Sequence, residues 1–350
     1  MSVERPVEWR LWHAWRSRGD VAALDACRRR LASAGIVLAD ATSSADAQAL
    51  KLHGIELLEF AQRDRERLID LRDVAAEQHW AERVDPRAWA FMADGDAVFG
   101  IPIVIHRANC LWSSRSLADQ LPPADGLLHW LHMASHHVTF PLVVGRDPWR
   151  IGVIFEMLLA AAGGDAYQRL LTTPQPADDR VELLRPILSQ MSQLREFVDE
   201  RLLELSWSEA LSHVADDGAG AMVMGDWAAS SGLCELTLVD LGPRYRTNVH
   251  VVDFFTPVGA NGEEALRRVA GLLADPTFQS ELAGLKGARP AVYLGRPDDS
   301  HEASVPSFVF DQCCALDVKQ SVLPLIAEHF LERRAVDESA VRIGLALSKR

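Results

Sequence analysis

The stretch from Gly100 to Trp112 changes abruptly from apolar residues to residues that can do chemistry. It begins with a run of isoleucine and valine that is typical of a strand buried on both faces. An ionisable ring, a cation and an amide follow at once, from His106, Arg107 and Asn109. Such side chains at the carboxyl end of a buried strand fit a ligand crevice at the edge of an α/β sheet. The alternative is a core strand followed by an ordinary polar turn.

The same pattern, an apolar strand that delivers polar and aromatic residues, occurs twice more. The apolar run 221–224 leads into Asp226 and Trp227, and the run 248–255 contains Asp253. The chain also has ten tryptophans against three tyrosines. Indoles offer planar apolar surfaces to ligands, but a bulky core explains the same excess, so the tryptophans alone leave both interpretations open.

Composition and charge exclude several classes of protein. The 350 residues suffice for two domains, and a net charge of -13 argues against a nucleic-acid partner. No apolar run approaches the ~20 residues that a membrane helix requires, so we expect no membrane insertion. The first residues contain no apolar segment of a secretory signal, and the five cysteines form no CxxC pair. The chain as written is therefore expected to be cytoplasmic, whereas a truncated N-terminus would make it periplasmic.

The hydrophobic pattern predicts an α/β fold from the first elements onward. Residues 7–15 alternate as a strand, a helix follows from Asp20 to Gly35, and residues 36–39 form a second strand. Residues 45–80 have a mainly helical period, and residues 91–98 predict a hairpin. Further helices are expected over 124–137, 147–164, 181–205, 206–215, 263–273, 277–285, 320–333 and 337–347, with a short strand at 140–144.

Five segments, in this order and spacing, resemble the glucose/mannose-type sugar-binding proteins of bacterial ABC importers, which belong to the extracellular solute-binding proteins. The segments are IPIVIHRANCLW, RDPWRIGVIFEMLLAAAGGDAYQ, GAGAMVMGDWAA, VVDFFTPVGA and ADPTFQSELAGLKGARPA. The resemblance covers about Val7 to Leu347. It implies an α/β fold of two lobes, with a ligand cleft between them and crossovers at a hinge. The lobes are expected at 1–111 plus 254–305, which is shortened, and at 112–253 plus 306–350.

The resemblance implies non-catalytic binding of a small carbohydrate for ABC transport, without a cofactor and with an ABC permease as partner. A pyranose has an apolar face that fits an indole and hydroxyls that donate to carboxylates. The family's ligand-binding positions fall on Trp15, Asp20, His106, Asn109, Trp227, Asp253 and Lys286. A structural role is the alternative for each of them, and equally for Trp112 in a core or Asp226 as a helix cap.

The sequence departs from the family pattern at several positions. The double tryptophan of the first strand is reduced to Trp15, and Lys51, His53 and Glu56 replace an expected polar pair. A family histidine falls near Phe310. These departures leave open a cytoplasmic sensor or interaction protein that kept the fold but lost the importer role. A glycosidase would need a paired acid and base, for which the sequence shows no spacing, so we do not expect an enzyme.

A cluster of histidines has spacing that could suit a metal site. His129, His132 and His136 are three and four residues apart, so a helix would place them on one face. No carboxylate or cysteine lies within the same turns, and we therefore expect no metal.

Overall fold

The computed structural model describes residues 7–259, 263–295 and 303–348. The chain divides into two compact units, each built from two segments: unit 1 comprises 1–106 and 251–300, and unit 2 comprises 107–250 and 301–350. The chain changes unit slightly earlier than the expected lobe boundaries at each of the three crossings. Asp253, expected as the last residue of a second-lobe segment, therefore belongs to unit 1, because the strand around it packs into the unit 1 core.

Unit 1 is built on a mixed sheet whose strands lie in the order β12–β6–β11–β3–β1–β2. Strand β1 pairs in parallel with β2 and β3, which confirms the predicted βαβ start, and β11 is antiparallel to β3. The strands are β1 Val7–Trp12, β2 Ile36–Asp40, β3 Ala49–Leu52, β6 Ile101–Arg107, β11 Asn248–Pro257 and β12 Arg289–Pro290. All ten residues of β11 are buried, which fits a strand between two others.

Two helix ends of unit 1 lie at the site described below, the start of α1 and the end of α13, and each is fixed by its local sequence. The Ser17 hydroxyl accepts the Asp20 N–H at 3.1 Å, and the Asp20 carboxylate accepts the Ser17 N–H at 3.1 Å, a capping box that begins α1. Helix α13 ends at Lys286 because Gly287 takes a φ of 66°. The helices are α1 Arg18–Ala32, α2 Gly54–Arg63, α3 Arg72–Glu77, α4 Trp80–Arg83, α5 Pro86–Met92, α12 Glu263–Leu273 and α13 Pro276–Lys286, and the hairpin is β4 Ala93–Asp94 with β5 Ala97–Val98.

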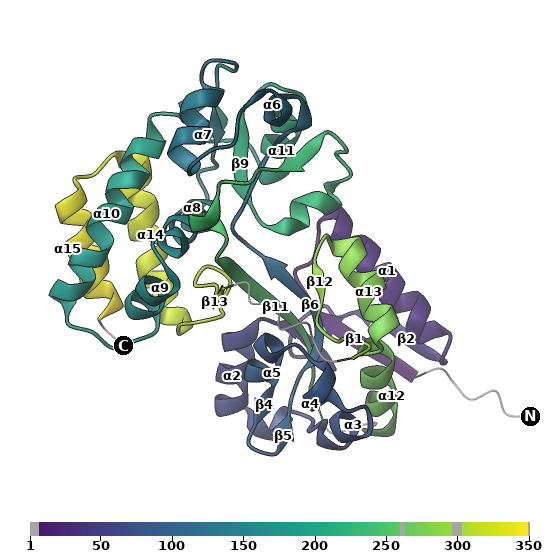
Figure 1. The fold of residues 1–350 in the computed structure, drawn as a ribbon. Helices are drawn as coiled ribbons and strands as arrows, with labels where there is room; N and C mark the ends of the chain where they lie inside the picture. Colours follow the sequence, from purple (N-terminus) through teal and green to yellow (C-terminus); the bar gives the residue numbers. More distant parts are fainter. Residues whose placement is uncertain (1–6, 260–262, 296–302, 349–350) are drawn as a thin grey trace, which may run out of the picture. The chain divides into compact units, whose positions relative to one another are not determined.

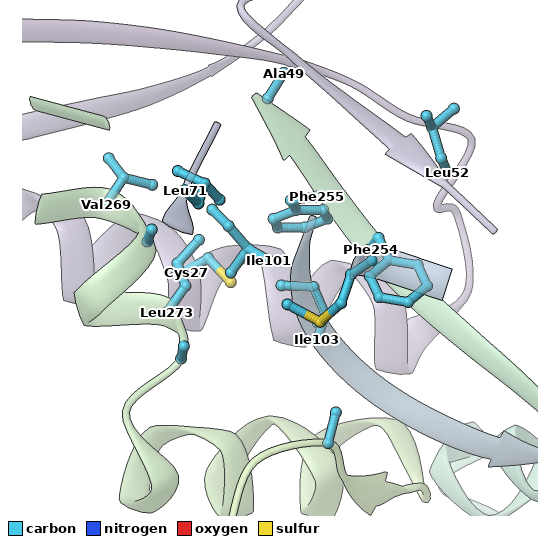
Figure 2. Packing of buried hydrophobic residues seen from close by; sticks show 14 of the residues in the cluster. Cys27, Ala49, Leu52, Leu71, Ile101, Ile103, Phe254, Phe255, Val269 and Leu273 are labelled. Carbon is cyan, nitrogen blue, oxygen red and sulfur yellow. The ribbon is translucent and has the colours of Figure 1, made fainter. Parts of the chain in front are cut away.

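The core of unit 1 joins the two central strands to the helices beside them. Figure 2 shows Ile101 and Ile103 of β6 near Phe254 and Phe255 of β11, with Cys27 of α1 close by. Each of these five side chains is 0% exposed. Fully burying each large apolar side chain contributes roughly 1.5–3 kcal/mol, so this core fixes β6 and β11 firmly.

Unit 2 contains a second, smaller sheet with the strand order β10–β7–β9–β8, surrounded by helices (Figure 1). Its strands are β7 Cys110–Ser114, β8 Leu142–Val143, β9 Ala221–Met224 and β10 Leu236–Leu238, and β13 Ser304–Pro306 pairs in parallel with the first residues of β11. The helices are α6 Arg115–Gln120, α7 Leu127–Ala134, α8 Pro148–Ala161, α9 Gly164–Leu171, α10 Ala177–Arg195, α11 Trp207–Ala215, α14 Leu316–Glu332 and α15 Val336–Leu347. Helices α10, α14 and α15 pack against one another.

Most predicted elements are confirmed within a few residues, but three predictions were wrong in part. Residues 49–52 form strand β3, not helix, because pairing with both β1 and β11 outweighs the local helical period. The first strand ends at Trp12. The helix predicted over 181–205 ends at Arg195, and a short 3₁₀ turn at Glu200–Leu202 follows. None of the helices in the described ranges has the length and apolar character that a membrane span requires.

Candidate functional site

The centre of the candidate site in unit 1 is Asp253, in the middle of β11 and only 3% exposed. Strand β11 lies between β6, which carries His106, and β3, which carries Lys51. Lys51 is paired with Phe255 across the antiparallel strands, so Lys51 and Asp253 are diagonal neighbours on one face of the sheet. The strand order therefore brings together residues that are about two hundred positions apart in the sequence.

Two buried ammonium groups bracket the Asp253 carboxylate. The Lys51 Nζ lies 2.9 Å from Oδ1, and the Lys286 Nζ lies 3.3 Å from Oδ2. Two imidazoles stand beside them, with His53 Nε2 at 3.4 Å from Oδ1 and His106 Nε2 at 3.9 Å from Oδ2. Lys51 also contacts the His53 ring. Each carboxylate oxygen thus faces one cation and one ring.

Lys286 joins this carboxylate to a second one and to an indole. Its ammonium donates to Asp20 Oδ1 at 2.7 Å and lies 3.6 Å from the centroid of the Trp15 ring, a cation–π contact. The other Asp20 oxygen caps α1, so the position of this carboxylate is fixed by the helix itself. Trp15 is 6% exposed and packs against Phe255, with ring centroids 5.3 Å apart. We refer to Trp15, Asp20, Lys51, His53, Glu56, His106, Asp253 and Lys286 as the Asp253 cluster.

The charges of the cluster shift the pKa values of its members. Burial raises the pKa of Asp253, but Lys51 and Lys286 outweigh this and hold it well below its usual range. The pKa of Asp20 is lowered in the same way, because Lys286 and the capping bonds outweigh burial. Burial opposes ionisation of Glu56, yet His53 lowers its pKa to about 2. Burial and Lys51 disfavour the charged His53 ring, but the carboxylates of Asp253 and Glu56 give it a net raised pKa.

The cluster is therefore a balanced set of donors and acceptors. Ionised carboxylates only accept hydrogen bonds, and ammonium groups only donate them, so a sugar hydroxyl, which does both, finds partners of each kind. All three carboxyl groups have lowered pKa values. The general acid of a glycosidase needs a raised pKa, so this chemistry suits binding and not glycoside hydrolysis.

Unit 2 contributes three aromatic rings, one of which contacts the other two. The Phe310 ring lies edge-on to Trp227, with centroids 5.3 Å apart, and 6.1 Å from Trp149. All three side chains are partly exposed. Gly225 is required beside them, because a Cβ there would lie 2.0 Å from the Trp227 ring. We call Trp149, Trp227 and Phe310 the aromatic group; its exposed apolar surface can stack on a flat ligand.

Two polar side chains of unit 2, the predicted Asn109 and Asp226 beside Trp227, make hydrogen bonds to backbone groups. Asn109 is 2% exposed; its Oδ1 accepts the Val249 N–H at 2.9 Å, and its Nδ2 donates to the Thr247 carbonyl at 2.8 Å. The Asp226 carboxylate accepts the Arg107 N–H at 2.8 Å. Both side chains therefore fix the segment that follows β6.

Trp112 has a structural role, and the three histidines in and just after α7 lie on the surface. Trp112 is buried in the unit 2 core and donates its indole N–H to the Gly225 carbonyl at 3.2 Å. His129, His132 and His136 are exposed. His129 accepts the Asp125 N–H at 3.1 Å through Nδ1, so one of its ring nitrogens is already engaged.

Of the predicted site residues, five come together in unit 1, and two belong to unit 2. The five are Trp15, Asp20, His106, Asp253 and Lys286; the two are Asn109 and Trp227. In the sequence, Lys51, His53 and Glu56 stand out only as departures from the family pattern, because the period of residues 45–80 is mainly helical. The alternation of Leu50, Lys51 and Leu52 was the available signal for a strand carrying a polar residue.

Comparison with known sequences finds distant but extensive similarity. No protein-family model matches the sequence. A protein of Rhizobium meliloti (strain 1021) is 24% identical over 339 residues, which cover 88% of this chain and 79% of that one. A protein of Brucella melitensis biotype 1 is 25% identical over 349 residues, again 88% of this chain and 79% of the other. Both are named "Probable sugar-binding periplasmic protein".

Solved structures share the fold over nearly the whole chain. The bacterial solute receptor AcbH, described as exclusively preferring β-D-galactopyranose, gives a TM-score of 0.80 at 12% identity and covers 98% of both chains. The solute-binding protein RafE in complex with raffinose gives 0.78 at 10% identity, covering 98% of this chain and 99% of RafE. The fold is therefore that of the solute-binding proteins, and the predicted fold class is confirmed. In sequence, the chain is similar to proteins named as sugar-binding periplasmic proteins, and in fold it is similar to solved solute-binding proteins.

Proposed function

We propose that this chain is a non-catalytic receptor that binds a small carbohydrate for ABC sugar import. The similarity to sugar-binding periplasmic proteins supports the class of function. The observation that carries it in the molecule is the Asp253 cluster, where carboxylates and ammonium groups alternate around the buried middle of β11. A ligand lacking the matching hydroxyls would displace water from these charged groups without replacing its hydrogen bonds, which is the physical basis of selectivity for polyols.

The members of the Asp253 cluster have distinct parts in this proposal. Lys286 and His106 donate to sugar oxygens, while Asp20 and Asp253 accept from hydroxyls and hold Lys286 in place. Trp15 contacts the Lys286 ammonium with its ring and lies against Phe255, so it supports the cluster from the core side. Asp253, with its two lysines, stabilises the empty protein as well as the complex.

Trp227 supplies the apolar contact in this proposal. Its indole is partly exposed and packs against the Phe310 ring, so part of its apolar surface can meet a ligand. Asn109 acts through the backbone it holds. The resemblance in sequence favours glucose or mannose as the sugar, whereas the solved relatives are described with galactopyranose, raffinose and maltose. The ABC permease is the partner that follows from the same resemblance.

A thermal-shift screen tests the proposal directly. The probes are D-glucose, D-mannose, D-galactose, maltose and raffinose, because a ligand that binds only the native state raises the melting temperature. At a hundred times its dissociation constant, a binding sugar stabilises the protein by about 2.7 kcal/mol. Lys286→Met should remove that shift, and His132→Ala, on the exposed face of α7, should retain it. A protein that melts at the same temperature with all five sugars is not a receptor for them.

The compartment is a separate part of the proposal. The relatives are named as periplasmic proteins, which favours export. None of the five cysteines, which all lie in the described part of the chain, forms a disulfide, and Cys234 is exposed. Both facts favour the alternative, a sensor that stays in the reducing cytoplasm. Fractionation of cells expressing the native gene from its own upstream region distinguishes them. Recovery in the periplasmic fraction would exclude the cytoplasmic sensor.

A further inference from the structure

One buried carboxylate of unit 2 lies outside every group of residues described above. Glu156, in the middle of α8, is 0% exposed. Its carboxylate accepts hydrogen bonds from the Tyr167 hydroxyl at 2.5 Å and the Ser307 hydroxyl at 2.9 Å, and from the backbone N–H groups of Phe308 and, at 3.3 Å, Val309. All of these partners donate, so the arrangement fits an ionised carboxylate, which only accepts.

Most of these donors belong to a single turn. Residues 307–310 follow β13, and Tyr167 comes from the neighbouring α9. The Ser307 hydroxyl itself accepts the Phe310 N–H at 3.1 Å. Glu156 and Ser307 together therefore bind three consecutive N–H groups of the turn. Because a buried N–H without a partner is costly, the conformation of the turn depends on this carboxylate.

The turn ends at the residue that organises the aromatic group. Phe310 contacts both Trp227 and Trp149, with ring centroids 5.3 Å and 6.1 Å away. The backbone of Phe310 is fixed through Ser307, and Ser307 is fixed through Glu156. A continuous chain of contacts thus leads from the carboxylate to the edge-on packing of Phe310 against Trp227.

We propose that Glu156 is a positioning residue for the aromatic group: by holding the turn 307–310, it sets the Phe310 ring against Trp227. The inference deepens the proposed function, on which it rests for the step from Trp227 to carbohydrate. Glu156 is fully buried, and in this proposal it acts on the aromatic group through the turn that carries Phe310. Its substitution should therefore alter the turn first and sugar affinity second.

Hydrogen exchange measures the first effect without any sugar. In Glu156→Gln, the amides of Phe308, Val309 and Phe310 should exchange at least about ten-fold faster than in the wild type, because Gln replaces one acceptor oxygen by a donating NH₂. The control is His329→Leu. His329 is another buried polar residue of unit 2, which donates from Nε2 to the Leu188 carbonyl and shares a hydrogen bond with the Ser339 hydroxyl, and its substitution should leave these amides unchanged. Unchanged exchange in a folded Glu156→Gln overturns the proposal.

A milder variant covers the case in which Glu156→Gln does not fold. Tyr167→Phe removes one donor to the carboxylate and leaves the ring in place. It should accelerate exchange of the same three amides about three-fold. If the amides exchange as in the wild type, Glu156 does not depend on this network to hold the turn, and the proposal fails.

A double-mutant cycle tests the second effect, with whichever of the five sugars raises the melting temperature. Glu156→Gln should weaken its binding about ten-fold in the wild-type background but less than about two-fold in Phe310→Ala, because contacting residues are not additive. An equal loss in both backgrounds would show that Glu156 acts independently of Phe310. If no sugar binds the wild type, the proposed function fails, and the exchange rates alone decide whether Glu156 holds the turn.

Discussion

Asp253 in unit 1 and Glu156 in unit 2 are both buried carboxylates, but their surroundings shift their pKa values in opposite directions. Asp253 faces the ammonium groups of Lys51 and Lys286, and its pKa lies well below the usual range despite burial. Glu156 has only neutral donors, and burial raises its pKa to about 7 although Tyr167 and the turn oppose this. Hydrogen bonds from neutral groups thus do not fully replace water around a carboxylate, whereas two cations do.

The difference suits what each unit contributes. The Asp253 cluster keeps charged donors and acceptors in place before any ligand arrives, and such preorganisation lowers the cost of binding a polar molecule. Glu156 instead fixes the backbone of the turn 307–310, which carries one ring of the aromatic group. The Asp253 cluster of unit 1 therefore offers polar contacts to a ligand, whereas the aromatic group of unit 2 offers apolar ones.

The largest expected effect comes from removing the charge of Asp253. Asp253→Asn leaves two buried ammonium groups without their carboxylate, which should lower the free energy of unfolding of the ligand-free protein by roughly 3–5 kcal/mol. Urea denaturation measures this. Asp20→Asn is the matched control, because Asp20 is more exposed and Lys286 keeps Asp253; it should cost clearly less. Equal stability of wild type and Asp253→Asn would remove the distinction between the two carboxylates.

The pH dependence of stability should separate the carboxylates next. A raised pKa, as for Glu156, contributes stability that is fully present below the ordinary value near 4.5 and is lost as pH rises through about 7. Unfolding free energies of wild type and Glu156→Gln should therefore differ by roughly 3 kcal/mol less at pH 8.5 than at pH 4.5. The lowered pKa of Asp253 acts in the opposite sense, and its stability is lost only as pH falls below about 3.8. A constant gap across this range would contradict the raised pKa of Glu156.

A smaller effect is expected for the aromatic group. Trp227→Ala should weaken sugar binding by roughly 1–3 kcal/mol, because stacking on an indole is lost. Its stability should change little, since the side chain is partly exposed. Trp15→Ala sharpens the comparison: that indole is 6% exposed, so its loss should destabilise the fold by roughly 3–5 kcal/mol. Isothermal titration and thermal melts of both variants check these expectations, and the reverse pattern would reassign the two tryptophans.

The smallest effect is expected at the edge of the Asp253 cluster. Glu56 is about one-third exposed and contacts His53 at 3.2 Å. Glu56→Gln should lower the pKa of His53 because a neighbouring carboxylate is lost, while stability changes by less than about 1 kcal/mol. An NMR titration of the His53 ring measures the shift. A His53 pKa that does not move would show that the Glu56 charge does not act on that ring.

Much of the fold was accessible from local patterns. Local sequence predicts the start of α1 from its capping residues Ser17 and Asp20, and the end of α13 from the glycine after Lys286. It also predicts β6, β9 and β11 from their apolar runs. Strand β3 was not accessible in this way. Its alternation of Leu50, Lys51 and Leu52 is too short to outweigh the helical period around it, and the four residues become a strand because β1 and β11 supply hydrogen-bond partners on both sides.

The candidate site divides along the same line. Sequence alone identified the types of residue involved, since His106, Asp253 and Trp227 interrupt or end apolar runs where a polar or bulky residue is conspicuous. It also indicated the class of fold, because the order of the five segments is itself a property of the sequence. The identity of the partners was not determined, because the choice between a solvated and a buried Lys286 depends on residues far away in the chain.

Tertiary structure decided the electrostatics. The antiparallel register of β3 and β11 brings Lys51 to Asp253, and the end of α13 brings Lys286 to both Asp20 and Asp253. The same holds for Glu156, whose place in an apolar helix gave no hint of the turn it binds. Sequence determines which groups carry charge, whereas their pKa values depend on distance and burial, and both of these arise only when the chain is folded.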